Sequence, residues 1–234
     1  MNDEFDDWDE VDFTRVPGGG GKMTLYRRED RYSIWIDGVE LMGCENHQSE
    51  DELARIVLAD PALNANPHVL IGGLGMGFTL AAALRDLPEN GRVTICELIP
   101  KVVEWNRGPL GHFAGRPLDD ARVAVAQKDV GRLLQTQLEE YDAILLDVDN
   151  GPEGLVRGGN DWLYTEEGLD AAYSALRPGG LLAVWSTFKD PAFYMRLKKT
   201  GFKDVRQVPV RITFGADNNG HDQHMIWTCR RPRT

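Results

Sequence analysis

Acidic side chains follow three buried strands of the predicted sheet, and a glycine-rich turn follows the strand before them. The turn is Gly72-Gly73-Leu74-Gly75-Met76-Gly77, directly after the apolar run at 69–71. Glu97, Asp129 and Asp147 come at or just after the ends of the next three apolar runs. Open α/β sheets bind ligands at the carboxyl ends of their strands, where glycine lets the backbone approach closely. Because three acids placed there need donors to satisfy them, we expect this edge of the sheet to bind a ligand.

The spacing of these acids indicates a nucleotide-type ligand. Glu97 lies 20 residues after Gly77, where an acid ending the second strand can accept hydrogen bonds from both hydroxyls of a ribose. Asp129 would then accept from the exocyclic amino group of adenine, and Asp147 would lie over the reacting end. The alternative is that each acid caps the following helix or faces solvent.

The elements that must position these residues alternate between strand and helix from residue 68 onward. The pattern predicts strand–helix units at 68–87, 92–108 and 122–137, a strand at 141–150, a helix at 165–180 closed by a Pro-Gly-Gly turn, a strand at 181–187, a helix at 190–202, and a closing hairpin of 205–214 with 224–231. Continuous apolar strands alternating with helices predict a parallel sheet covered on both faces.

The chain divides into three predicted parts. Residues 1–22 read as an acidic, flexible terminus with a glycine-rich break at 16–22, and residues 23–48 as a small N-terminal β-appendage. Residues 49–234 form a Rossmann-like domain. Seven acids and no base lie in residues 1–12, so most of the net charge of −11 belongs to that terminus.

Composition excludes several classes of protein. The chain has 234 residues, 42% of them hydrophobic, which is enough for one sizeable core. A mildly acidic body argues against a nucleic-acid partner, and no apolar run reaches the roughly 18 residues of a membrane span. The acidic start is unlike a secretory signal, and three scattered cysteines suggest neither disulfides nor a metal site. We expect a cytoplasmic protein without a metal.

The predicted sheet limits which nucleotide-type ligand the chain can bind. A dinucleotide enzyme would continue with a second mononucleotide half, and the length leaves little room for a substrate domain. A seven-stranded sheet with a reversed last strand instead matches the class I S-adenosylmethionine-dependent methyltransferase fold.

The strand-end motifs also resemble a known family. VLIGGLGMGFTL, VTICELIPKVVEWNRG, YDAILLDVDNGPEG and LYTEEGLDAAYSALRPGGLLAVWS are similar to spermidine synthases (polyamine aminopropyltransferases), in particular a bacterial branch labelled spermidine synthase-like. The resemblance covers roughly residues 23–214. It implies binding of S-adenosylmethionine or its decarboxylated form, with Glu97 on the ribose, Asp129 on the adenine, and the loop of Gly72, Gly73, Gly75 and Gly77 on the methionine-derived tail. It also implies a homodimer formed through the N-terminal β-elements.

Three departures separate the chain from that family's pattern. Gly75 stands where aminopropyltransferases carry an acid, and Asn150 where they carry the second Asp of an Asp-Ser-Ser-Asp-Pro-type loop that begins at Asp147. Their Tyr-His-Glu motif is missing, with His47-Gln48-Ser49-Glu50 nearby. An acid in the glycine loop attracts the bare ammonium of the decarboxylated form and repels the carboxylate of ordinary S-adenosylmethionine, so Gly75 removes both effects.

These departures lead to the main functional expectation, a methyltransferase that uses S-adenosylmethionine and acts on a small molecule or peptide. Alignment supplies much of the rate of methyl transfer, because the sulfonium is already activated. Asp147 is expected to bind cofactor or acceptor, and Asp149 and Asn150 to orient the nucleophile. The alternatives are an aminopropyltransferase using decarboxylated S-adenosylmethionine, with Asp149 as a displaced base, and a non-catalytic interaction protein.

Overall fold

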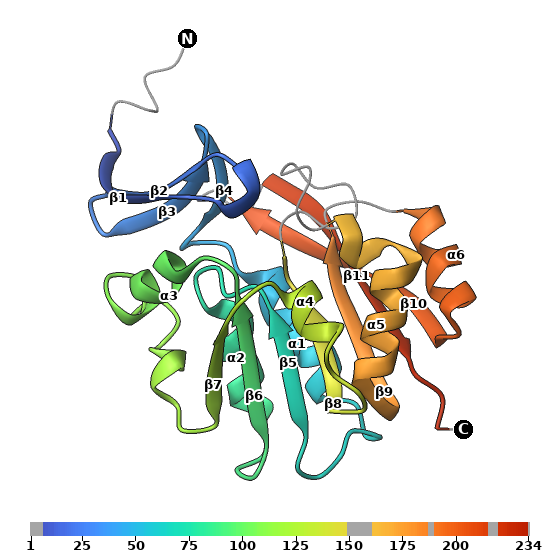
Figure 1. Cartoon of the computed structure of the whole chain (residues 1–234). Helices are drawn as coiled ribbons and strands as arrows, with labels where there is room; N and C mark the ends of the chain where they lie inside the picture. Colours follow the sequence, from blue (N-terminus) through green and yellow to red (C-terminus); the bar gives the residue numbers. More distant parts are fainter. Residues whose placement is uncertain (1–6, 149–160, 187–189, 215–219, 234) are drawn as a thin grey trace.

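Two β-sheets organise the described residues of the computed structural model, which are 7–148, 161–186, 190–214 and 220–233 (Figure 1). The larger sheet has seven strands in the order β10-β11-β9-β8-β5-β6-β7. They are β5 (His68–Gly72), β6 (Arg92–Glu97), β7 (Val123–Gln127), β8 (Tyr141–Leu146), β9 (Leu176–Ser186), β10 (Lys203–Phe214) and β11 (Gly220–Arg230). The smaller, antiparallel sheet contains β1 (Asp9–Arg15), β2 (Lys22–Arg28), β3 (Arg31–Ile36) and β4 (Val39–Gly43).

The pairing in the larger sheet confirms the predicted fold class. β5 pairs in parallel with β6 and with β8, and the parallel pairing continues to β7 on one side and β9 on the other. β11 is antiparallel to both β9 and β10, so the last strand is reversed. The chain therefore has an α/β, Rossmann-like sheet of the class I methyltransferase type with an N-terminal β-appendage.

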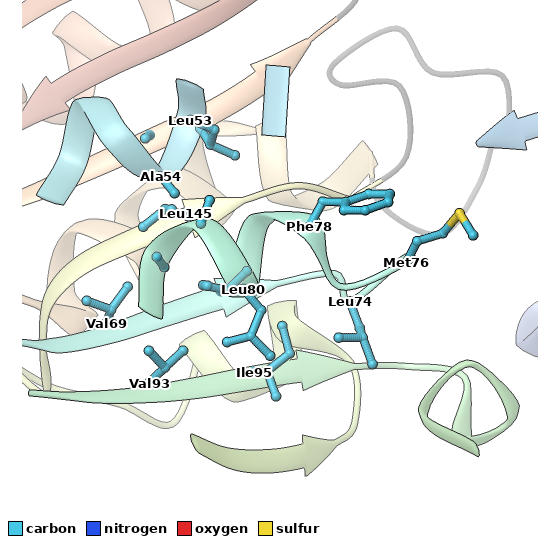
Figure 2. Packing of buried hydrophobic residues seen from close by; sticks show 14 of the residues in the cluster. Leu53, Ala54, Val69, Leu74, Met76, Phe78, Leu80, Val93, Ile95 and Leu145 are labelled. Atoms are coloured by element: carbon cyan, nitrogen blue, oxygen red, sulfur yellow. The ribbon is translucent and has the colours of Figure 1, made fainter. Parts of the chain in front are cut away.

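Helices cover both faces of this sheet (Figure 1). Side chains of α1 (Gln48–Leu58), α2 (Phe78–Asp86) and α3 (Pro100–Arg107) join one core cluster, and those of α4 (Val130–Leu134), α5 (Glu166–Ala175) and α6 (Pro191–Thr200) join the other. Consecutive residues of β5 alternate between them: Val69 and Ile71 pack in the first cluster and Leu70 in the second. Figure 2 shows the first cluster, where Leu53 and Ala54 of α1 lie across from the strands. Burial on both faces explains why the strands read as continuous apolar runs.

The N-terminal boundary differs from the prediction. Strand β1 lies within the stretch that the sequence predicted to be a flexible terminus, and the glycine-rich break contains a short 3₁₀ turn at Pro17–Gly19. The acids of β1 have partners from other elements, which favours order: Lys22 Nζ donates to Glu10 at 2.6 Å, and Trp105 Nε1 donates to Asp12 at 3.0 Å. A charge count along the sequence misses such partners.

The Pro-Gly-Gly turn was also predicted in the wrong element. Helix α5 ends at Ala175, and Arg177-Pro178-Gly179-Gly180 belongs to β9. The Gly179 amide donates to Arg231 O and the Arg231 amide donates to Gly180 O, both at 2.9 Å, so the segment pairs with the C-terminal residues. Two further 3₁₀ turns lie at Pro117–Asp119 and Asp161–Tyr164. Across the described residues, no helix is long and apolar enough to span a bilayer.

Candidate functional site

The glycine-rich turn between β5 and α2 passes directly beside the end of β8. Gly73 has a φ of +90°, and a Cβ there would collide with the carbonyl oxygen of Asp147. Gly75 has a φ of +51°, and its Cβ would lie 2.8 Å from Met42 Sδ. Glycine is thus required at Gly73, where a side chain would meet the backbone that follows β8, whereas at Gly75 the neighbour is the flexible end of Met42 from β4.

Glu97, the last residue of β6, fastens this turn to the start of α3. Its Oε2 accepts from the Leu74 amide at 2.9 Å and its Oε1 from the Ile99 amide at 2.8 Å. Only 7% of the residue is exposed, and it borders a cavity described below. Asp129 lies at the start of α4 and accepts from the Arg132 amide at 3.1 Å, which is the capping role weighed from the sequence.

Asp147 follows β8 and lies beside α2. Thr79 Oγ1 donates to Asp147 Oδ2 at 2.5 Å. The residue keeps some surface inside the site, but its carboxylate lies deep among protein atoms. Desolvation, aided by repulsion from Glu50, raises the pKa of Asp147 to about 7, while the Thr79 hydrogen bond opposes that rise.

Glu50, in the first turn of α1, supplies a second carboxylate next to Asp147. Ser49 Oγ donates to Glu50 Oε2 at 2.6 Å, and His224 Nδ1 lies 3.1 Å from the same Ser49 Oγ. Burial is the main cause of a raised pKa at Glu50, and no Lys or Arg of the described segments forms a salt bridge with Glu50 or Asp147. The two neighbouring acids are half-buried, and among the described residues the basic group that opposes the raised pKa of Glu50 is His47.

Two cavities meet at these acids. The first, which we call the glycine-loop cavity, has a volume of about 220 Å³ and is bordered by Gly73, Gly75, Glu97, Asp129 and Asp147. The second, the α1 cavity, has a volume of about 630 Å³ and is bordered by residues of α1, α2, β4, β9, β10 and β11, with Glu50, Thr79, Trp185 and His224 among them. Both cavities are lined by Leu41, Met42, Gly75 and Asp147.

The N-terminal sheet closes the glycine-loop cavity from the other side. Val16 and the glycine-rich turn through Gly20 line it, together with Met23, Ile34 and Ile36. The segment predicted to be a flexible break is therefore a wall of the site. Met42, on β4, reaches the junction of the two cavities.

Of the seven predicted site residues that the structure describes, five line one cavity and two do not. Gly73, Gly75, Glu97, Asp129 and Asp147 line the glycine-loop cavity, while Gly72 and Gly77 flank the loop without lining either cavity. Asp149 and Asn150 lie outside the described residues.

Sequence reasoning missed Thr79 and the 16–20 wall, and it gave Glu50 no role. A glutamate after an N-terminal Ser reads as ordinary helix-start chemistry, so only the fold brings it to Asp147. Thr79 gave no signal at all, because a threonine in the first turn of a helix is unremarkable in sequence.

Comparisons with known proteins match a family model and several polyamine aminopropyltransferases, as well as one protein-L-isoaspartate O-methyltransferase. The family model described as "Spermine/spermidine synthase domain" matches residues 51–213, which is more than half of the chain. Polyamine aminopropyltransferase 2 of Pseudomonas aeruginosa is 31% identical over 158 residues, 64% of this chain and 42% of that protein. Polyamine aminopropyltransferase of Oceanobacillus iheyensis is 29% identical over 171 residues, 71% of this chain and 32% of that protein.

The fold has solved relatives as well. A crystal structure of spermidine synthase in complex with the transition-state analogue AdoDATO matches with a TM-score of 0.75 at 19% identity, covering 96% of this chain and 74% of that chain. The matches to the two curated relatives span less than half of those proteins' lengths.

The prediction of a methyltransferase as the main function is therefore wrong, because the family model and these relatives point to aminopropyl transfer. The error has a physical cause. The absence of an acid at Gly75 was taken as the loss of a carboxylate from the reacting end, but Glu50 stands beside Asp147 there, contributed by a helix far from the loop in sequence. The chain belongs to the spermine/spermidine synthase family.

Proposed function

We propose that this chain is a polyamine aminopropyltransferase that takes its aminopropyl group from decarboxylated S-adenosylmethionine. The observation that carries the proposal is the pair of carboxylates, Asp147 and Glu50, at the junction of the two cavities. A half-buried acid pair without a Lys or Arg salt bridge in the described segments favours a cationic ligand, and a polyamine is a chain of ammonium groups. The names of the relatives, polyamine aminopropyltransferases, support the same chemistry.

In this proposal the glycine-loop cavity holds the aminopropyl donor. A carboxylate has about four lone-pair positions, so Glu97 can accept from ribose hydroxyls as well as from the Leu74 and Ile99 amides. Asp129 uses one oxygen to cap α4 and offers the other to the amino group of adenine. The aliphatic side chains of Ile34, Ile36 and Val130 provide apolar surface for the base. When bound, the donor supplies a sulfonium whose neighbouring methylene carbon is ready for attack.

The α1 cavity, in the same proposal, holds the amine that receives the group. Glu50 and Asp147 attract its ammonium, and that positive charge offsets the repulsion between the two carboxylates. Because Asp147 borders both cavities, it places the amine nitrogen at the donor side of the junction.

The reaction requires the ammonium to lose a proton, since only a neutral amine has a lone pair to attack with. Asp147, with a pKa of about 7, accepts that proton at neutral pH. The amine nitrogen then forms a bond to the methylene carbon while the carbon–sulfur bond breaks. The electron pair of the broken bond neutralises the sulfonium, and the transferred proton remains on the acid pair until it leaves to solvent.

Incubation of the purified protein with either decarboxylated or ordinary S-adenosylmethionine, in the presence of aliphatic diamines and triamines, tests this function. Mass spectrometry should detect an amine enlarged by one aminopropyl group with the decarboxylated donor alone. Absence of that product with every amine tried, from folded protein that binds the donor, would refute the proposal.

We also propose that the chain forms a homodimer through its N-terminal sheet. Val11, Phe13 and Val39 of this sheet are 44%, 53% and 56% exposed, which is high for large apolar side chains. Multi-angle light scattering should give twice the mass of 26.2 kDa, and Phe13→Ser should shift the equilibrium toward the monomer. A monomeric wild-type protein at micromolar concentration would contradict this.

A further inference from the structure

We propose that Ser49 and His224 form a proton path that empties the acid pair after each turnover, an inference that rests on the proposed amine chemistry. Glu50, Ser49 and His224 all line the α1 cavity. Glu50 and Ser49 are adjacent in α1, whereas His224 lies on β11, near the C-terminal end of the sequence. The path thus connects the acid pair to a different strand of the sheet.

The path consists of two hydrogen bonds through one hydroxyl. Ser49 Oγ lies 2.6 Å from Glu50 Oε2 and 3.1 Å from His224 Nδ1, and only 2% of Ser49 is exposed. The His224 ring packs edge-on against Trp185, with ring centroids 4.8 Å apart, which restrains the direction of Nδ1. One buried hydroxyl therefore bridges a carboxylate and a held imidazole.

The donor direction of these bonds reverses with the position of the proton. When Glu50 is ionised it can only accept, so the single Ser49 hydrogen points to Glu50 and His224 Nδ1 must donate to Ser49. When Glu50 is protonated it can donate to Ser49 Oγ, and the Ser49 hydrogen can then pass to an unprotonated His224 Nδ1. A proton thus leaves Glu50 and arrives on His224 without motion of any heavy atom, and no electrons are exchanged.

Such a path would return the acid pair to its ionised form after it has taken a proton from the amine. Asp147 and Glu50 repel one another, and desolvation disfavours the ionised form of Asp147, so the pair favours a bound proton. His224 is only half-buried, so it can exchange with solvent. The other charged groups around the path are His47 and Asp51 on α1, and Arg31, Glu40 and Glu45, which line the same cavity.

Two substitutions of His224 separate proton transfer from simple positioning. His224→Asn keeps a hydrogen-bond donor near the Nδ1 position but cannot take up a proton, and His224→Ala removes both. We expect either variant to lower kcat by about 10-fold or more, with the KM for the amine within about 2-fold of wild type. Added imidazole should restore kcat in His224→Ala. A wild-type kcat in His224→Asn would show that positioning is enough and would overturn the path. A wild-type kcat in His224→Ala without imidazole would overturn it as well.

Ser49→Ala breaks the path between its ends, so its kcat should fall similarly and imidazole should not restore it. The matched control is His112→Asn, since His112 is exposed and lines neither cavity. Thermal midpoints and donor affinity by isothermal titration show whether each variant is folded. Rescue of Ser49→Ala by imidazole would refute the role of the hydroxyl.

An assay without turnover keeps failure of the path distinct from failure of the proposed function. The infrared carbonyl band of the protonated acid pair, assigned by its loss in Glu50→Gln, can be followed against pH in the absence of substrate. His224→Asn should displace the titration of this band, and an unchanged titration would overturn the path. Wild-type protein that makes no aminopropyl product would instead refute the proposed function.

Discussion

The two cavities that meet at Asp147 are built in different ways. The carboxylates of the glycine-loop cavity come from the ends of three parallel strands of one sheet, β6, β7 and β8, so regular strand–helix alternation places them. The α1 cavity is assembled from α1, β4, β9 and β11, which are widely separated in the chain. The difference shows that a helix packed against the sheet can bring an acid to a strand-end site, as α1 brings Glu50 to Asp147.

Substitution of Asp147 should have the largest effect on activity, because this residue lines both cavities. Asp147→Asn keeps the shape of the side chain but cannot accept the amine's proton, so kcat/KM for the amine should fall by about 1,000-fold or more. Steady-state kinetics by product detection measures this. Asp119→Asn, at an exposed acid outside both cavities, is the control. Less than a 10-fold loss would remove Asp147 from the proton transfer.

The same substitution should change how stability depends on pH. Because the pKa of Asp147 is raised to about 7 in the folded protein, the folded state binds more protons than the unfolded state between pH 4 and 7. Without ligand, the contribution of Asp147 to the free energy of unfolding should therefore fall as pH rises through this window. The stability advantage of Asp147→Asn over wild type should grow by on the order of 3 kcal/mol between pH 4 and 8. Urea denaturation measures it, and parallel curves for the two proteins would contradict the raised pKa.

Glu50 distinguishes the α1 cavity from its neighbour. Glu50→Gln removes one charge that attracts the ammonium, so the KM for the amine should rise by roughly 30-fold while donor affinity is retained. Glu52→Gln is a matched control on the same helix, since Glu52 pairs with Arg55 and lines neither cavity. An unchanged KM in Glu50→Gln would place the amine elsewhere.

Substitution of Glu97 tests the glycine-loop cavity alone, and we expect its effect to be the smallest. Glu97→Gln keeps one amide contact but loses a charged acceptor for the ribose, so donor affinity should fall by about 10-fold. The KM for the amine should stay within about 2-fold of wild type. Isothermal titration with the donor measures the first quantity, and equal losses for donor and amine would show that the two cavities do not act separately.

The fold and one half of the site were predictable because their signals are local. The apolar runs of β5, β6 and β8 and the acids at their ends follow directly along the chain, and Glu97 and Asp129 lie where that pattern places them. Glu50 and His224 could not be placed in this way, because their relation to Asp147 depends on how α1 and β11 pack against the sheet. β1 was missed for a similar reason, since its acids are balanced by Lys22 and Trp105 from other elements.

The wall formed by residues 16–20 has an evolutionary consequence. These residues line the glycine-loop cavity yet lie outside the seven-stranded sheet, next to strand β1, whose Asp12 is tied to α3 through Trp105 and Lys101. Val16 also packs against the first core cluster, but substitutions at 17–20 can alter the shape of the cavity through residues that lie outside that cluster. Substitutions in the N-terminal appendage can therefore change ligand preference while the strand-end acids stay the same. Selection or engineering can act on one sheet without changing the other.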